Sequence, residues 1–170
     1  MKKSLQTVEK TDTALILKKS NMLLGITKKI LSDKLVLKKT TDIVLNNKVW
    51  QDPDTNLVWQ VDVEDKRYKW DNIQQSADKL NRENYGGYSD WKVPTKDELK
   101  TILTQEEYKG YYIKEPLLES IINSSSSHYW SSSTYEDYKS YAWNVYFYGG
   151  YMSHYGKDRN YYVRCVRVGQ

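Results

Sequence analysis

The distribution of tyrosine constrains the fold of this chain more than any other feature of its sequence. Ten of the sixteen tyrosines fall between Tyr129 and Tyr162, a segment that makes up a fifth of the 170 residues. Strands favour aromatic side chains, and strand alternation places every second side chain on the same face of a sheet. We therefore expect this segment to form strands that present several tyrosines on one sheet face and in its loops.

The aromatic content indicates a binding surface. The chain has six tryptophans and sixteen tyrosines but only one phenylalanine, so amphipathic rings carry much of its hydrophobic content. Tyrosine offers a large contact area at low entropy cost, and serine, glycine and asparagine add adaptable hydrogen bonds, which is the composition of an antibody paratope. An exposed aromatic patch of this size favours a partner. The alternative is a sheet that uses tyrosine for its strand propensity alone.

A lysine-rich arm, residues 1–47, precedes the aromatic domain, residues 48–170. Residues 1–40 hold ten lysines and three acidic residues, a net charge of +7, so the rest of the chain carries 4 − 7 = −3. Apolar residues recur every seven positions and predict an amphipathic helix that begins near Ala14 and is interrupted at Gly25; they are Ile16, Leu23 and Ile30, and Leu17, Leu24 and Leu31.

The predicted helix has three possible partners. It can pack on its own domain, self-associate with a second copy of the chain, or lie on a membrane surface with its lysines in the polar face. Nucleic acid is not expected, because the arm has no aromatic residues for base stacking.

The sequence predicts no transmembrane segment and no general secretory signal. No apolar run approaches the roughly 20 residues that span a bilayer, and Lys18 and Lys19 interrupt the apolar residues of the arm. The localisation is left open between the cytoplasm and export by a route without a signal. The only cysteine, Cys165, excludes an internal disulfide, and its valine neighbours in a predicted strand favour a small buried apolar residue.

Local patterns predict a hairpin followed by two helices. Val49–Gln51 and Leu57–Gln60 flank Asp52–Asn56, whose proline, aspartates and asparagine favour a tight turn. The same turn resembles the start of a calcium loop but lacks the glycine at its sixth position and the glutamate at its twelfth, so no metal site is expected. Helices are predicted over residues 70–81, with Ile73, Ala77 and Leu80 on the buried face, and after the capping box of residues 95–98.

Three strands are predicted in the last third of the chain, Tyr129–Tyr135, Tyr141–Phe147 and Tyr161–Val168. The serine run before the first of them is interpreted as an ordered loop within the same domain. The mixture of helices and strands predicts an α+β fold.

Five ordered blocks within residues 49–168 resemble the Lcl C-terminal domain family. The blocks are residues 54–60, 86–99, 129–132, 142–145 and 163–167. The resemblance implies a C-type-lectin-like fold, akin to that of the formylglycine-generating enzyme, with a twisted antiparallel sheet, two helices and long loops on a ligand face. Independently of the resemblance, we expect the large apolar rings of four tryptophans to pack in or around the core: Trp59, Trp91, Trp130 and Trp143. We expect Arg164 and Arg167 to pair with carboxylates such as Asp90.

The resemblance also implies a source of variation. Some members of the family are targets of diversity-generating retroelements, whose copying errors fall at adenines and convert codons of the asparagine type into a limited set of others. We call the residue types that such errors can produce the reachable set. The segment also contains residues that we interpret as invariant, namely Val145, Phe147, Gly150 and Lys157. Two further residues, Glu136 and Lys139, lie outside the reachable set. The predicted ligand-binding residues belong to that set: Tyr135, Asp137, Tyr138, Ser140, Tyr141, Tyr146, Tyr148, Tyr151, Ser153, His154, Tyr155, Asp158, Arg159, Asn160 and Tyr161.

These patterns predict a non-enzymatic protein that binds a protein or another macromolecule without a cofactor. A glycan-binding, adhesin-like domain is the first alternative, although a sulfated ligand would need more cations than Lys139, Lys157 and Arg159 supply. An oxidase of the formylglycine-generating type is the second, but it is expected to have paired cysteines, and Cys165 stands alone. His128 and His154 have no nucleophile or metal-ligand partner at a recognisable spacing.

Overall fold

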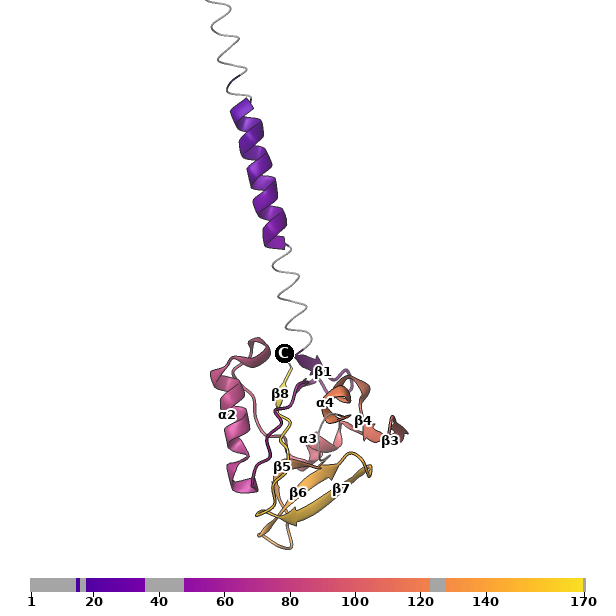
Figure 1. The fold of residues 1–170 in the computed structure, drawn as a ribbon. Coiled ribbons are helices and arrows are strands. Elements are labelled where there is room, and N and C mark those ends of the chain that lie inside the picture. Colours follow the sequence, from indigo (N-terminus) through magenta and orange to yellow (C-terminus); the bar gives the residue numbers. More distant parts are fainter. Residues whose placement is uncertain (1–14, 16–17, 36–47, 123–127, 170) are drawn as a thin grey trace, which may run out of the picture. The chain divides into compact units, whose positions relative to one another are not determined.

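The computed structural model describes residues 15, 18–35, 48–122 and 128–169. The chain divides into two compact units, Met1–Val44 and Leu45–Gln170, and each is described by itself (Figure 1).

The described part of the first unit is residue 15 together with a helix over residues 18–35. It runs through Gly25 without a break, so the predicted interruption is wrong; one glycine lowers helix stability by only about 1 kcal/mol relative to alanine. The expected helix start near Ala14 lies outside the described residues. The large apolar side chains of the described residues in this unit are 49% to 64% exposed, and they are Leu15, Met22, Leu23, Leu24, Ile26, Ile30, Leu31 and Leu35.

An apolar face exposed to this degree favours a partner for the helix, and self-association stays a prediction. Within the described part of the chain, no helix combines the length and the apolar character needed to cross a membrane.

The second unit is an α+β domain, as predicted (Figure 1). Its strands form three antiparallel sheets rather than one. The first sheet has the order β1–β2–β8 (Val49–Gln51, Leu57–Gln60, Val166–Val168), the second is β3–β4 (Leu103–Tyr108, Tyr111–Ile113), and the third is β5–β6–β7 (His128–Thr134, Tyr141–Tyr146, Tyr151–Gly156).

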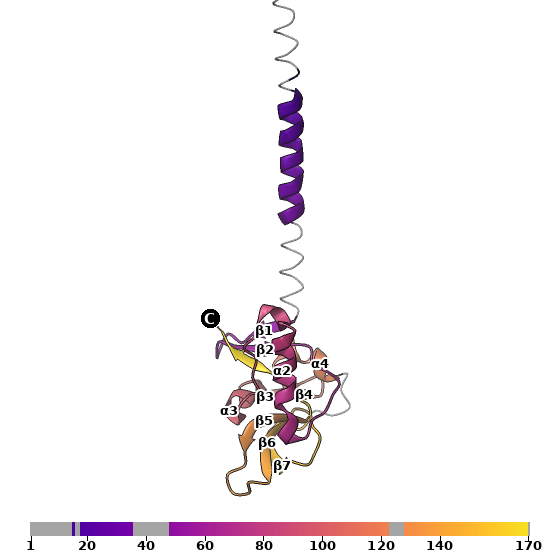
Figure 2. The same ribbon diagram turned by 90° about the vertical axis from the view of Figure 1, so that its left-hand side faces the viewer.

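Within the described part of this unit, three α-helices accompany the sheets, where two were expected: α2 (Gln74–Arg82), α3 (Lys96–Lys100) and α4 (Glu119–Ile122). Short 3-10 turns cover Trp70–Asn72, Tyr85–Gly87 and Glu115–Leu117. α2 lies along one side of the domain (Figure 2).

The predicted hairpin and helices are confirmed. Residues 52–56 turn between β1 and β2, with Asn56 at φ 60°. Thr95 and Glu98 form both bonds of the capping box that begins α3. α2 follows a 3-10 turn, and the expected residues Ile73, Ala77 and Leu80 are buried.

The core has two clusters. One surrounds Trp59, Leu99 and Phe147, and the other surrounds Trp91, Trp130 and Ala77. Three of the four tryptophans assigned to the core are therefore buried. Trp143 is half-buried instead, because it alternates with Ala142 and Asn144 in β6 and its ring lies beneath the ammonium group of Lys96, 5.0 Å away.

The predicted last strand is much shorter than expected. Only Val166–Val168 pairs as β8, while Tyr161 and Tyr162 make isolated bridges with Tyr68 and Tyr129. Cys165 therefore precedes the strand, although it is fully buried as predicted. The pairing of Arg167 with Asp90 is confirmed, at 2.6 Å from Nε to Oδ1 and 3.1 Å from Nη2 to Oδ2.

The buried position of the Cys165 thiol predicts low reactivity. Burial raises the pKa of Cys165 to about 12, although the thiol lies 3.6 Å from the Ser76 hydroxyl. Since the thiolate is the nucleophile, we expect alkylation by iodoacetamide at neutral pH to be orders of magnitude slower in the folded protein than in urea, as followed by intact mass. Equal rates in the two conditions would contradict this placement.

Candidate ligand-binding surface

The tyrosine-rich segment forms the β5–β6–β7 sheet. β6 and β7 pair without interruption from Tyr141 opposite Gly156 to Tyr146 opposite Tyr151. β5 pairs with β6 from His128 opposite Tyr146, and its register shifts before Thr134. β7 was not among the three strands predicted for the last third of the chain.

One group of rings lies on one face of this sheet, and we call it the His154 group. Trp143 and His154 are opposite each other, and Tyr141 is two residues before Trp143 on the same face. The His154 imidazole stacks on Tyr135 with 3.8 Å between ring centroids and meets the edge of Trp143 at 5.6 Å. Tyr138 stacks in turn on Tyr135 at 6.2 Å. The group comprises Tyr135, Tyr138, Tyr141, Trp143 and His154.

A second group surrounds His128 on the opposite face. The His128 imidazole stacks on Tyr146 at 4.2 Å and on Tyr161 at 4.7 Å, and Tyr155 contacts it edge-on at 5.6 Å. Tyr151 and Tyr148 pack against Tyr146 at 5.5 and 6.0 Å. This His128 group comprises His128, Tyr146, Tyr148, Tyr151, Tyr155 and Tyr161. Tyr146, Tyr151 and Tyr155 share one face of the sheet, as the sequence predicted, whereas Tyr141 lies on the other face.

The predicted ligand-binding residues are all half-buried or exposed. The most exposed rings are Tyr138 at 64% and Tyr148 at 60%. Tyr161 is the most constrained, because it pairs with Tyr68 and packs on Trp130 at 4.7 Å. The exposed members are Asp137, Tyr138, Ser140, Tyr141, Tyr148, Tyr151, Asp158, Arg159 and Asn160, and the half-buried ones are Tyr135, Tyr146, Ser153, His154, Tyr155 and Tyr161.

Several residues interpreted as fixed have structural contacts. Val145 and Phe147 are fully buried in the core. Gly150 has φ 74°, and a Cβ there would lie 2.7 Å from the Tyr112 ring, so another residue would be strained. The Lys157 ammonium lies 3.8 Å from the centroid of the Trp70 ring and donates to the Thr134 hydroxyl at 3.0 Å.

The Glu136 side chain is also fixed by contacts with its neighbours. Its carboxylate accepts hydrogen bonds from Lys96 at 2.5 Å and from the Trp143 indole at 2.9 Å. The bond from Lys96, followed by that from Trp143, lowers the pKa of Glu136 to about 2. This carboxylate therefore stays ionised and fixes the Trp143 ring within the His154 group.

The sequence missed His128 as a centre of the surface. Its Nδ1 lies 3.1 Å from Oδ1 of Asn144, which is fully buried. Burial lowers the pKa of His128 despite this hydrogen bond, and the nearby charge of Arg159 lowers it further. The rings therefore surround a neutral imidazole at neutral pH. In the sequence, the one indication of this role was that His128 directly precedes the predicted strand Tyr129–Tyr135.

A family model for the Lcl C-terminal domain matches residues 48–167. The chain belongs to the Lcl C-terminal domain family. The match begins immediately before β1 and includes all five blocks noted in the sequence, together with both ring groups of the Lcl C-terminal domain. No curated protein matches the chain.

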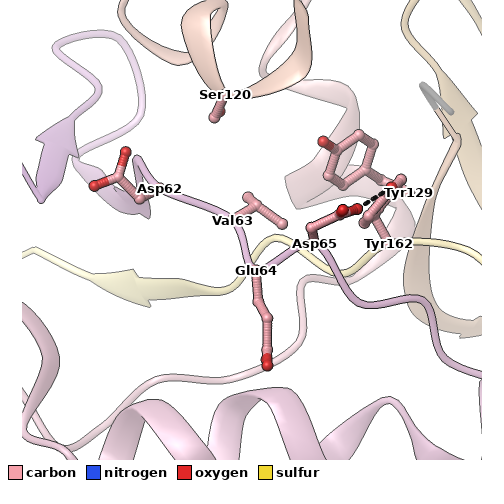
Figure 3. Close-up of a pocket in the computed structure, with 7 residues that line it drawn as sticks. All are labelled: Asp62, Val63, Glu64, Asp65, Ser120, Tyr129 and Tyr162. Carbon is pink, nitrogen blue, oxygen red and sulfur yellow. Dashed lines mark hydrogen bonds between the residues drawn. The ribbon is translucent and has the colours of Figure 1, made fainter. Parts of the chain in front are cut away.

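A separate cavity of about 210 Å³ lies away from the predicted residues. Figure 3 shows its acidic side chains pointing in different directions, with Asp65 accepting a hydrogen bond from the Tyr162 hydroxyl at 2.7 Å. Glu64 instead lies 3.1 Å from the Lys79 ammonium. Among the described residues, no group of three or more His, Cys, Asp or Glu side chains is placed to hold a metal ion. The cavity is lined by Asp62, Val63, Glu64, Asp65, Ser120, Tyr129 and Tyr162.

Proposed function

We propose that this Lcl C-terminal domain is part of a non-enzymatic protein that binds a macromolecular ligand through a surface diversified by a retroelement. The observation that carries the proposal is the separation of two classes of residue along one segment. The predicted ligand-binding residues are all half-buried or exposed, whereas Val145 and Phe147 between them are fully buried. Substitution of the predicted ligand-binding residues therefore changes the surface and leaves the buried core residues in place.

The composition of this surface supports a protein ligand. Its rings provide large contact areas, and the hydroxyl groups provide adaptable hydrogen bonds. Its exposed charges nearly cancel, with Asp137 and Asp158 beside Lys139 and Arg159. A sulfated glycan would require a cationic surface, and Lys157 is already engaged by Trp70 and Thr134.

The DNA downstream of the gene tests diversification. We expect a near-identical repeat of the segment encoding residues 129–167 that differs only at adenines, with a reverse transcriptase gene nearby. Long-read sequencing of the source genome answers this directly. A genome without the repeat would exclude retroelement diversification while leaving ligand binding open.

Substitution of four tyrosines in the His128 group tests ligand binding. The full chain, labelled with biotin, is applied to protein arrays and to glycan arrays that include sulfated glycans. We expect signals on proteins to fall at least roughly a hundredfold in the variant with Tyr146, Tyr148, Tyr151 and Tyr155 changed to alanine, since each aromatic contact contributes about 1 kcal/mol or more.

Tyr108→Ala is the matched control, because Tyr108 is 45% exposed and lies in β3, outside both ring groups. Signals confined to sulfated glycans would favour the lectin alternative. Signals unchanged in the fourfold variant would place the binding surface elsewhere.

A further inference from the structure

The outer edge of β7 is the feature of the sheet that the proposed function leaves unexplained. β7 is the last strand in the order β5–β6–β7, and among the described residues it pairs with β6 alone (Figure 1). It carries variable side chains on both faces, with His154 in one ring group and Tyr151 and Tyr155 in the other. A ligand resting on one face would meet only one of these groups.

The backbone of β7 alternates between paired and outward groups. The Lys157 N–H donates to the Ser140 carbonyl at 2.9 Å, in register with the β6–β7 ladder. In an antiparallel pair this bonding repeats at every second residue, so Tyr151, Ser153 and Tyr155 bond to β6. Met152 and His154 direct their N–H and C=O groups away from β6, and among the described residues no hydrogen bond outside the ladder uses them.

This edge also lacks the features that usually protect edge strands. Natural sheets discourage pairing at an edge with charged residues, proline or a bulge. β7 has the sequence YMSHYG, which contains neither charge nor proline, and its register with β6 is continuous over six pairs. β5, by contrast, has a register shift. A six-residue edge with unpaired backbone groups is therefore available for another strand.

We propose that an extended segment of the protein ligand pairs with the outer edge of β7 as an added strand. Backbone bonds at Met152 and His154 hold the segment whatever its sequence. Its side chains alternate between the two faces, so successive residues meet the His154 group and the His128 group in turn. Variation on both faces then changes specificity while the backbone bonds persist. This inference rests on the proposed function, because it assigns a ligand class to the same surface.

Amide hydrogen exchange in the full-length protein gives the first test. We expect fast exchange at Met152 and His154 and slow exchange at Ser153 and Tyr155, measured residue by residue by NMR. Slow exchange at all four amides would show that the edge is already covered and would overturn the proposal.

The second test uses linear peptides selected from a random displayed library against the full chain. Each selected peptide is then methylated at one backbone nitrogen at a time. We expect affinity to fall roughly tenfold or more at alternate residues and to change little at those between, because only every second N–H faces β7. Tight binding without this period of two would overturn the proposal.

A matched pair of variants separates the backbone from the side chain. His154→Ala and His154→Pro both remove the imidazole, but only proline removes the outward N–H, and proline is tolerated where the N–H of an edge strand faces solvent. We expect the proline variant to bind the peptides at least roughly tenfold more weakly than the alanine variant, with circular dichroism showing that both are folded. Equal affinities would overturn edge pairing.

A second library of folded scaffolds distinguishes failure of edge pairing from failure of the proposed function. If scaffolds bind in a tyrosine-dependent way but no linear peptide does, the edge proposal fails and the proposed function stands. If neither library gives a binder that depends on the variable residues, both fail.

Discussion

Replacing Arg164 with methionine should lower the free energy of unfolding by about 3–5 kcal/mol. Arg164 is fully buried, and its guanidinium joins three segments. Nη1 donates to the carbonyls of Gln60 and Val61 at 2.6 and 2.9 Å, and Nη2 donates to the Ser120 hydroxyl at 2.6 Å. Methionine fills similar volume but leaves these acceptors buried without a donor. Urea denaturation followed by tryptophan fluorescence measures the loss.

Arg164→Lys provides the matched control for this experiment. Lysine keeps the charge but has a single ammonium group, so it cannot reach both the Gln60 and Ser120 sides as the planar guanidinium does. We expect the lysine variant to be less stable than wild type and more stable than the methionine variant. Stability of the methionine variant within about 1 kcal/mol of wild type would show that these bonds contribute little net energy.

Arg164 also marks a limit of prediction from the sequence. Both Arg164 and Arg167 were expected to pair with carboxylates, and only Arg167 does so. The partners of Arg164 are mainly backbone carbonyls, up to 104 residues away in the chain. A local pattern cannot show which distant carbonyls the fold brings to one arginine. The hairpin of residues 52–56 and the capping box at Thr95 were predictable because their interactions are local.

The candidate surface was predictable in its membership but not in its geometry. The predicted ligand-binding residues all reach the surface, whereas Tyr129, Asn144 and Tyr162, which are of the same residue types, are buried. The division into two faces depends on the pairing of Trp143 with His154 and of Tyr146 with His128, which requires the register of β6 with both neighbours. β7 was missed because serine, histidine and glycine weaken its strand pattern, and its pairing with β6 overrides that weak local preference.

Replacing Lys114 with methionine should destabilise the domain by about 2–4 kcal/mol. The Lys114 ammonium lies 2.8 Å from the carboxylates of both Asp52 and Asp54 and joins the β1–β2 turn to the residue after β4. Asp52 is fully buried, and its second oxygen accepts a bond from the Thr55 hydroxyl at 2.7 Å. Without Lys114, the Asp52 carboxylate stays buried but has no ammonium group to balance its charge. Urea denaturation of the single variants Lys114→Met and Asp52→Asn and of the double variant isolates the coupling between the two residues.

The pH dependence of this effect distinguishes a lost ion pair from lost packing. Burial alone would raise the pKa of Asp52, but the bonds from Lys114, Thr55 and Asp54 lower it overall. A lowered pKa adds stability above the unfolded value of about 3.9, and this stability is lost as pH falls through the folded value. In Lys114→Met, burial dominates, so ionised Asp52 is penalised at neutral pH and relieved by protonation. The stability gap between wild type and variant should therefore narrow as pH falls from about 7 toward 3, whereas a constant gap would assign the effect to packing.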